Sequence, residues 1–264
     1  MLPEFEAISF RRIIEKGAHT KPWLIEVNTD HGPTPYIVKI YTIAQNAARN
    51  SITAEVIGNV LARGFELKVP DAAIIHFPED FRMFLNSECQ VVLDLADERP
   101  KFGSEYLSPV NEFTTEISKA TFERHIDLDT LYAFDNYIRN SDRGERKPNL
   151  LLHNKKAWLI DHEMAFDISE QTIDQFNNKI WEDKFGRYHL SFRYLTKARK
   201  ITKDHYFETF LEYLRLLNIG ILNTYFDQLE AFGYDTKRKL ILDYLEHVKQ
   251  NSSNFVTILR HFIR

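Results

Sequence analysis

The pattern of apolar residues changes from a strand type to a helix type near residue 110, and this change limits the folds open to the chain. Residues 5 to 45 contain the β-rich runs "PWLIEVN" and "PYIVKIY", separated by the turn-forming "TDHGPT". One amphipathic helix, "NSITAEVIGNVLARG", comes next, and "KVPDAAIIHF" predicts a further strand. Beyond residue 110, helical patterns such as "KRKLILDYLEHVKQ" dominate. We expect an α+β fold with a β-rich N-terminal lobe that contains one helix (1–104) and a mainly helical C-terminal lobe (105–264).

The composition is typical of a protein of the reducing cytoplasm. A chain of 264 residues with 44% hydrophobic residues can bury a large core. Its one cysteine, Cys89, excludes an intrachain disulfide and a multi-cysteine zinc site. The N-terminal "MLPEFEAISFRRIIEKG" lacks the apolar core of a secretory signal, and no apolar run is long enough for a membrane helix. The net charge of −4 gives no basic footprint, so we expect no direct nucleic-acid partner and no membrane.

Several common catalytic motifs are absent from the sequence. The nine glycines are never closer than six positions apart, which excludes a Walker loop and a GxGxxG fingerprint. No two histidines lie within five residues of each other, and Asp167 stands where an HExxH motif starting at His162 would need its second histidine. No GxSxG nucleophile motif occurs. The candidate chemistry therefore depends on carboxylate, amide and lysine side chains.

The stretch "SDRGERKPNLLLHNKKAWLIDHE" is expected to bring three oxygen-bearing side chains together. Its apolar runs "LLL" and "AWLI" predict a β-hairpin across the four-residue turn "HNKK". Because a hairpin returns the chain to its starting point, Asn149 and Asp161 should lie side by side. The loop after Asp142 can bend back to the same place. Such oxygen ligands suit magnesium, although an ordinary surface hairpin with polar ends would have the same pattern.

Two residues of the N-terminal half add a second part to this pattern. Lys39 lies in the middle of the β run "YIVKIY", and Glu55 lies on the flank of the apolar stripe of the following helix. A strand lysine that contacts ATP phosphates and pairs with a helix glutamate belongs to the phosphoryl-transfer apparatus of protein kinases. Taken alone, Lys39 could be a solvated edge lysine and Glu55 a solvated helix residue. Their order and spacing before Asp142, Asn149 and Asp161 favour the kinase interpretation.

With these residues the chain resembles the HipA-like kinase family, which shares its catalytic logic with phosphatidylinositol kinases and protein kinases. The segments that carry the resemblance are "EKGAHTKPWLIEV", "PYIVKIY", "TAEVIGNVLARGFELKVP", "KFGSEYL", "FDNYIRNSDRGERKPNLLL" and "WLIDHEMAF". They cover roughly residues 15 to 166. The resemblance implies a bilobal protein-kinase-like fold that uses ATP and Mg²⁺ as cofactors.

The resemblance also implies a role for each matching residue. Asp142 would be the catalytic base, Asn149 and Asp161 would hold the metal, and Lys39 would contact the α- and β-phosphates while Glu55 orients it. The loop over the phosphates would comprise Gly17, Ala18, His19, Thr20 and Lys21, and the strand and hinge beside adenine would comprise Glu105, Tyr106 and Leu107.

Three departures from the family pattern bear on these assignments. Four residues usually separate the catalytic aspartate from the metal asparagine, whereas six separate Asp142 from Asn149. The usual spacing would put Lys147 in the ligand position, which a cation cannot fill. His162 and Glu163 follow Asp161 in place of a glycine-containing turn, so the activation segment is expected to differ. The chain is also shorter than full-length HipA toxins, and we expect no counterpart of their extra N-terminal subdomain.

Three functions of different classes fit the sequence. The first is an active kinase for a protein Ser/Thr or a small hydroxyl compound, and the retention of all five key residues favours it. The second is a pseudokinase-like module that binds nucleotide for regulation, and the third is a structural partner protein that uses its helical tail. The expected partners are a hydroxyl substrate, which the sequence does not identify, and a small regulatory protein.

The loop after Asp142 also contains two arginines. Arg143 or Arg146 would lie near the phosphates, unless each is a solvated loop charge.

Overall fold

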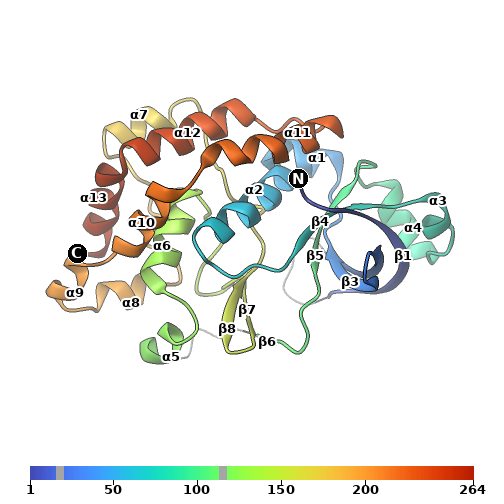
Figure 1. Ribbon diagram of the computed structural model, residues 1–264, viewed down its shortest axis with the longest axis horizontal. Helices are drawn as coiled ribbons and strands as arrows, with labels where there is room; N and C mark the ends of the chain where they lie inside the picture. The colour runs from blue at the N-terminus through green and yellow to red at the C-terminus, as the bar shows by residue number, and fades with distance from the viewer. Residues whose placement is uncertain (16–20, 113–117) are drawn as a thin grey trace. The chain divides into compact units, whose positions relative to one another are not determined.

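The strands of the N-terminal half close into a barrel in the computed structural model of the protein, which describes residues 1–15, 21–112 and 118–264 (Figure 1). The barrel order is β1-β2-β3-β5-β4, with β1 and β4 parallel and the other pairs antiparallel. The strands are β1 (Glu4–Ile13), β2 (Trp23–Thr29), β3 (Gly32–Val38), β4 (Ala72–His76) and β5 (Lys101–Glu105).

The β2–β3 hairpin shows how local sequence builds this barrel. Trp23, Ile25 and Val27 alternate along β2 and are all buried, because successive side chains of a strand point to opposite faces. The two strands pair from Trp23 to Thr29, and Gly32 closes the turn at a φ of 93°. A side chain at this φ would be strained, which accounts for the glycine in "TDHGPT". The predicted strands around this turn are therefore confirmed.

Helices in the same half correct the expectation of a single helix. The predicted helix is α2 (Ser51–Gly64), and α1 (Ile43–Arg49), α3 (Glu79–Met83) and α4 (Ser87–Asp94) also form before β5. Thr42 begins α1 with a capping box shared with Gln45, and Asn86 caps α4 by accepting from the Cys89 amide. Helices α1, α3 and α4 have 7, 5 and 8 residues, so their apolar periodicity is too short to be recognised in the sequence. Cys89 is buried in the hydrophobic core to which the barrel strands also contribute.

The chain forms two compact units that are not contiguous stretches of sequence. Unit 1 comprises Met1–Val56, Pro70–Ser108 and Asn223–Thr236, and unit 2 comprises Ile57–Val69, Pro109–Leu222 and Lys237–Arg264. Helix α2 therefore contributes residues 51–56 to unit 1 and 57–64 to unit 2. The sequence predicted one boundary between residues 104 and 105, near the end of the second segment of unit 1 at Ser108.

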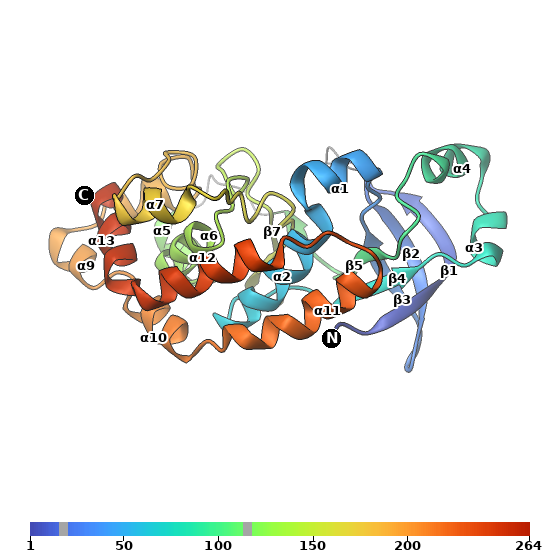
Figure 2. The same ribbon diagram turned by 90° about the horizontal axis from the view of Figure 1, so that it is seen from above.

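Unit 1 is completed by a late segment of the chain, helix α11 (Asn223–Ala231) and the residues that follow it. The amide of Gln228 exchanges two hydrogen bonds with the backbone of Leu2, each of 2.9 Å, and Figure 2 shows the N-terminus beside α11. Arg99 donates to the carbonyl of Gly233 and stacks over the Tyr234 ring with 3.9 Å to its centroid. Polar and aromatic contacts thus attach this segment to the residues that precede β1 and β5.

Unit 2 combines a small sheet with helices around an aromatic core. The sheet order is β6-β7-β8, and Phe65, which follows α2, stacks on Phe210 with 4.9 Å between ring centroids. Phe210 in turn packs against Phe255. The elements are β6 (Asn111–Glu112), α5 (Lys119–Glu123), α6 (Leu128–Tyr137), β7 (Leu150–His153), β8 (Lys156–Leu159), α7 (Thr172–Asn177), α8 (Phe192–Thr196), α9 (Lys200–Asp204), α10 (Glu208–Leu216), the 3₁₀ helix η1 (Ile219–Leu222), α12 (Arg238–Gln250) and α13 (Ser252–Ile263).

The helices of the described ranges are all too short or too polar to cross a lipid bilayer. The order of the elements along the chain agrees with the predicted mixed α+β architecture, which is rich in strands towards the N-terminus and in helices towards the C-terminus.

Candidate active site

The predicted ion pair between Lys39 and Glu55 is confirmed within unit 1. The Nζ atom of Lys39 donates to Oε1 of Glu55, and the two side chains are 12% and 2% exposed. Strand β3 ends at Val38, so Lys39 follows the strand and does not lie in its middle as predicted. Its backbone N–H still reaches the Phe102 carbonyl of β5 at 3.3 Å. A charge pair this buried is held in one place by its surroundings.

The other residues predicted to contact nucleotide are placed only in part. Gly17, Ala18, His19 and Thr20 lie outside the described residues. Lys21 is exposed, and its Nζ lies 3.6 Å from a carboxylate oxygen of Glu15. Glu105 is the last residue of β5, and its N–H donates to the carbonyl of Asp71. Tyr106 donates from its N–H to the carbonyl of Pro35, and Leu107 is half-buried just before unit 1 ends.

The hairpin of β7 and β8 forms where the sequence predicted it, with a shorter turn. His153 and Lys156 pair across the hairpin, so the turn consists of Asn154 and Lys155 alone. Both turn residues have positive φ, 49° and 60°, which a two-residue turn of this hand requires. At the open end the N–H of Ile160 donates to the Asn149 carbonyl at 3.1 Å. Asn149 and Asp161 therefore lie at the two ends of one hairpin, as expected.

Both predicted metal ligands have an unusual backbone conformation. Asn149 has a φ of 49° and Asp161 a φ of 62°, in the left-handed region that asparagine and aspartate enter more easily than most residues. Such conformations persist only where the surrounding structure holds them, and they often mark functional sites.

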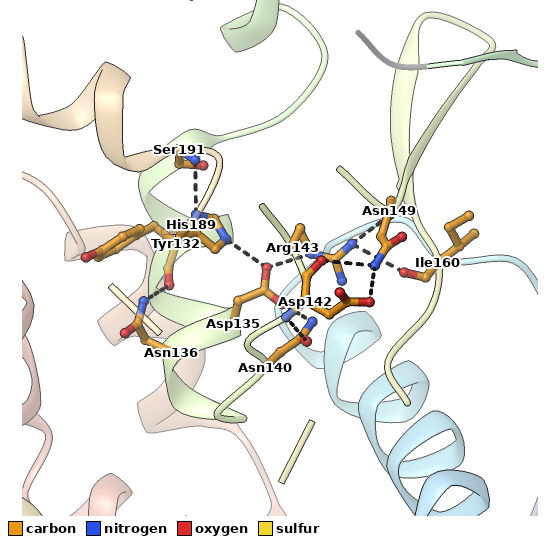
Figure 3. A network of polar contacts seen from close by, with 10 residues as sticks. All are labelled: Tyr132, Asp135, Asn136, Asn140, Asp142, Arg143, Asn149, Ile160, His189 and Ser191. Carbon is orange, nitrogen blue, oxygen red and sulfur yellow. Dashed lines mark hydrogen bonds and ion pairs between the residues drawn. The ribbon is translucent and has the colours of Figure 1, made fainter. Parts of the chain in front are cut away.

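Asp142 and Asp161 meet at the ammonium group of Lys147, and Asn149 binds Asp142. The Lys147 Nζ lies 2.6 Å from Oδ2 of Asp142 and 3.0 Å from Oδ2 of Asp161. The Asn149 amide donates to Oδ2 and to the backbone carbonyl of Asp142, each at 3.2 Å (Figure 3). Burial alone would lower the pKa of Lys147, but Asp161 and Asp142 outweigh it and raise that pKa. The predicted convergence of the three residues is thus observed within unit 2.

This donor set fits a divalent cation. Two carboxylates already enclose one positive group, the Lys147 ammonium, which stands in for a metal ion. Carboxylate and amide oxygens are the protein ligands that Mg²⁺ prefers. The side chain of Asp142 is 26% exposed and that of Asp161 is 11% exposed, so solvent and ligands can reach the cluster.

A buried ionic cluster supports the loop that carries Asp142. Arg143 has no exposed side-chain surface, and its Nε donates to Oδ2 of Asp135 at 2.6 Å. Its Nη1 donates to the carbonyls of Asn149 at 2.6 Å and Ile160 at 3.3 Å (Figure 3). Neither predicted role, a phosphate contact or a solvated charge, fits Arg143. The arginine instead connects helix α6 to the residues at both ends of the hairpin.

His189 completes this cluster in its neutral form. The N–H of Ser191 donates to Nδ1 of His189 at 3.1 Å, so the ring proton is on Nε2, which lies 3.0 Å from Oδ2 of Asp135. Burial lowers the pKa of His189 despite the opposite effect of Asp135. Burial would raise the pKa of Asp135, but Arg143 and His189 outweigh it and hold that pKa at about 2. Sequence reasoning missed His189, because only the tertiary fold brings it to Asp135.

Asn140 links the buried cluster to the candidate base. Its amide donates to Oδ1 of Asp135 at 2.9 Å, and its Oδ1 accepts from the Asp142 N–H at 3.2 Å. Asp135 and Asn140 thus hold the backbone of Asp142 in place. After the hairpin, His162 is buried against helix α2, where a Cβ at Gly58 would lie 2.7 Å from the His162 Cβ. The absence of a side chain at Gly58 therefore makes room for the residue that follows Asp161.

A match to a family model confirms the predicted resemblance. A family model described as HipA-like kinase matches residues 8–211, and the chain belongs to this family. The crystal structure of a Helicobacter pylori proinflammatory kinase, CtkA, is similar with a TM-score of 0.45 and 11% sequence identity, over 96% of this chain and 99% of that chain. No curated protein matches the sequence.

Proposed function

We propose that the protein is an ATP- and Mg²⁺-dependent phosphotransferase that transfers the γ-phosphate to a hydroxyl group, with a protein serine or threonine as the acceptor. The observation that carries the proposal is the convergence of the Asp142 and Asp161 carboxylates on one cation, with Asn149 beside them. Membership of the HipA-like kinase family and the Lys39–Glu55 ion pair support it. We also propose the bilobal kinase-like fold and a cytoplasmic location that the sequence predicted.

Each residue has a distinct role in this proposal. Lys39 contacts the α- and β-phosphates, and Glu55 keeps its ammonium group in position. Asp142 accepts the proton of the attacking hydroxyl, while Asn149 and Asp161 hold Mg²⁺. The metal supplies positive charge for the phosphate oxygens. Glu105, Tyr106 and Leu107 lie along the adenine.

The buried cluster contributes by fixing distances. Arg143 binds the carbonyls of Asn149 and Ile160, and Asn140 binds the amide of Asp142. Phosphoryl transfer depends mainly on positioning and on electrostatic stabilisation, so small displacements of these groups reduce the rate strongly. The cluster therefore acts through the residues it positions and does not touch substrate.

A second candidate function is a regulatory module that binds nucleotide without transferring phosphate. The observation in its favour is that Lys147 and Asn149 both bind the carboxylate that would serve as base. A base that is permanently engaged could not accept a proton. Both candidate functions include nucleotide binding, but only the first includes phosphate transfer.

Two measurements test the proposal. Mg-ATP at millimolar concentration should raise the melting temperature, because a ligand that binds the folded state stabilises it. Mass spectrometry after incubation with Mg-ATP should then find phosphate on the protein or on an added protein substrate. No shift in melting temperature would reject the nucleotide site, and a shift without any phosphate transfer would favour the regulatory module.

The variant Asp142→Asn separates binding from catalysis. Removing a general base should lower the transfer rate by about 10²–10⁴-fold. The affinity for ATP should remain largely intact, because a base acts mainly in the transition state. Full activity of this variant would show that another group is the base.

A further inference from the structure

Lys147 occupies the sequence position that kinases give to a metal ligand. Four residues separate it from Asp142, the usual spacing between the catalytic aspartate and the asparagine that holds a second metal ion. A cation cannot bind a metal ion, so this position must do something else here. The structure places the Lys147 ammonium within ion-pair distance of both Asp142 and Asp161, at 2.6 and 3.0 Å.

The loop that carries Lys147 is supported along its length. Gly144 pairs with His189 in an isolated bridge, and the carbonyl of Arg143 accepts from the Leu190 N–H at 3.0 Å. Glu145 forms an ion pair with Arg193 at 3.3 Å. The buried Arg143 side chain fixes the loop to helix α6. Lys147 therefore extends from a braced loop, and its meeting with two carboxylates is a built feature of unit 2.

The positive charge of Lys147 explains how this residue can replace a metal ion. A protein-kinase site with asparagine at this position binds two divalent ions with the nucleotide. In this chain the ammonium already supplies one positive charge between Asp142 and Asp161. Lysine is a compact point charge with three donors, so it can bridge two carboxylates without the strict geometry that Mg²⁺ demands.

We propose that Lys147 is a resident cation that takes the place of one of the two metal ions, so that the protein binds a single divalent ion together with its nucleotide. The part of this inference that concerns the nucleotide-bound ion rests on the proposed function. It also has a consequence without nucleotide: the ammonium competes with divalent ions for the Asp142 and Asp161 carboxylates.

The first experiment measures Mn²⁺ binding to the full chain without nucleotide, by electron paramagnetic resonance of the free ion. Lys147→Met removes the charge at similar length and should tighten Mn²⁺ binding by about tenfold or more. Lys147→Arg retains the charge and should bind Mn²⁺ as the wild type does. Lys156→Met, an exposed lysine of the same hairpin, controls for overall charge. Unchanged Mn²⁺ affinity in Lys147→Met would overturn the proposal.

A second neutral variant, Lys147→Gln, keeps this test decisive if Lys147→Met does not fold. Circular dichroism establishes that each variant is folded before it is titrated. Tighter Mn²⁺ binding in either folded neutral variant supports the resident cation, and wild-type affinity in that variant rejects it.

The second experiment counts Mn²⁺ ions bound with the non-hydrolysable β,γ-imido analogue of ATP. The wild type should bind one ion per chain, and Lys147→Asn, which restores asparagine at the usual spacing, should bind two. Two ions on the wild type would overturn the proposal. If the analogue does not bind the wild type at all, the proposed function fails, and the titration without nucleotide still decides the role of Lys147.

Discussion

Two ionic clusters of unit 2 use the same kinds of groups in different surroundings. Asp135, Arg143 and His189 have side chains that are at most 1% exposed, whereas Asp142 and Lys147 are 26% and 29% exposed. The central contact in each cluster, carboxylate to cation, measures 2.6 Å. Distance alone therefore does not distinguish them.

The difference in burial separates a structural cluster from an exchangeable one. A buried charge that loses its partner cannot recover hydration, so Arg143 must stay on Asp135. A partly exposed charge that loses its partner is solvated again at smaller cost, so Lys147 and Asp142 can change partners. The buried cluster holds the backbone still, and in the proposed function the partly exposed cluster carries the chemistry.

The largest expected effect is the loss of the buried arginine. Arg143→Met leaves the Asp135 carboxylate buried with less compensation and should reduce the free energy of unfolding by about 3–5 kcal/mol. Chemical denaturation measures this change. The double variant Asp135→Asn, Arg143→Met removes both charges and should recover part of the loss. A single variant within about 1 kcal/mol of the wild type would contradict the structural role of the cluster.

The next effect is a loss of stability in acid. The folded pKa of Asp135, about 2, lies below its ordinary value of 3.8, so its contribution is present above pH 4 and disappears as the pH falls towards 2. This contribution is about 2 kcal/mol. His189 adds a loss that begins as the pH falls through 6.5, because its folded pKa is lowered and the unfolded chain takes up the proton first.

Urea midpoints between pH 7 and pH 2 measure this dependence. The double variant that lacks both Asp135 and Arg143 charges is the matched control, and its stability should fall less between pH 4 and pH 2. Equal falls in the control and the wild type would show that Asp135 does not carry the effect.

The smallest expected effect on stability belongs to the exposed cluster. Lys147→Met should change the free energy of unfolding by less than about 1 kcal/mol, because solvent screens exposed ion pairs. Thermal denaturation at low salt and at 0.5 M salt, roughly a threefold shorter screening length than at 0.05 M, measures the remaining contribution. A loss as large as that of Arg143→Met would remove the distinction between the two clusters.

The local elements of the site could be predicted from the sequence. The apolar runs around "HNKK" predicted the hairpin, and the hairpin alone placed Asn149 beside Asp161. The apolar stripe and Gly64 predicted α2 within one residue of its observed bounds. These features depend on neighbours along the chain, where periodicity and turn residues carry the information.

The interactions between distant segments could not be predicted in the same way. Arg143 lies in a polar loop, and only the approach of Asp135 and His189 shows that it is buried. The positive φ values of Asn149 and Asp161 also follow from the supports around them. Lys147 was recognised as occupying the usual ligand position, but its contact with both carboxylates depends on the path of the loop.

The attachment of α11 to the barrel has a consequence for biosynthesis. Residues 1–108 leave the ribosome well before Gln228, Gly233 and Tyr234, which bind Leu2, Arg99 and Pro100. At the usual speed of translation the delay is on the order of ten seconds. During that interval the nascent barrel presents the surface that α11 will cover, so its last folding step waits until the segment Asn223–Thr236 has been made.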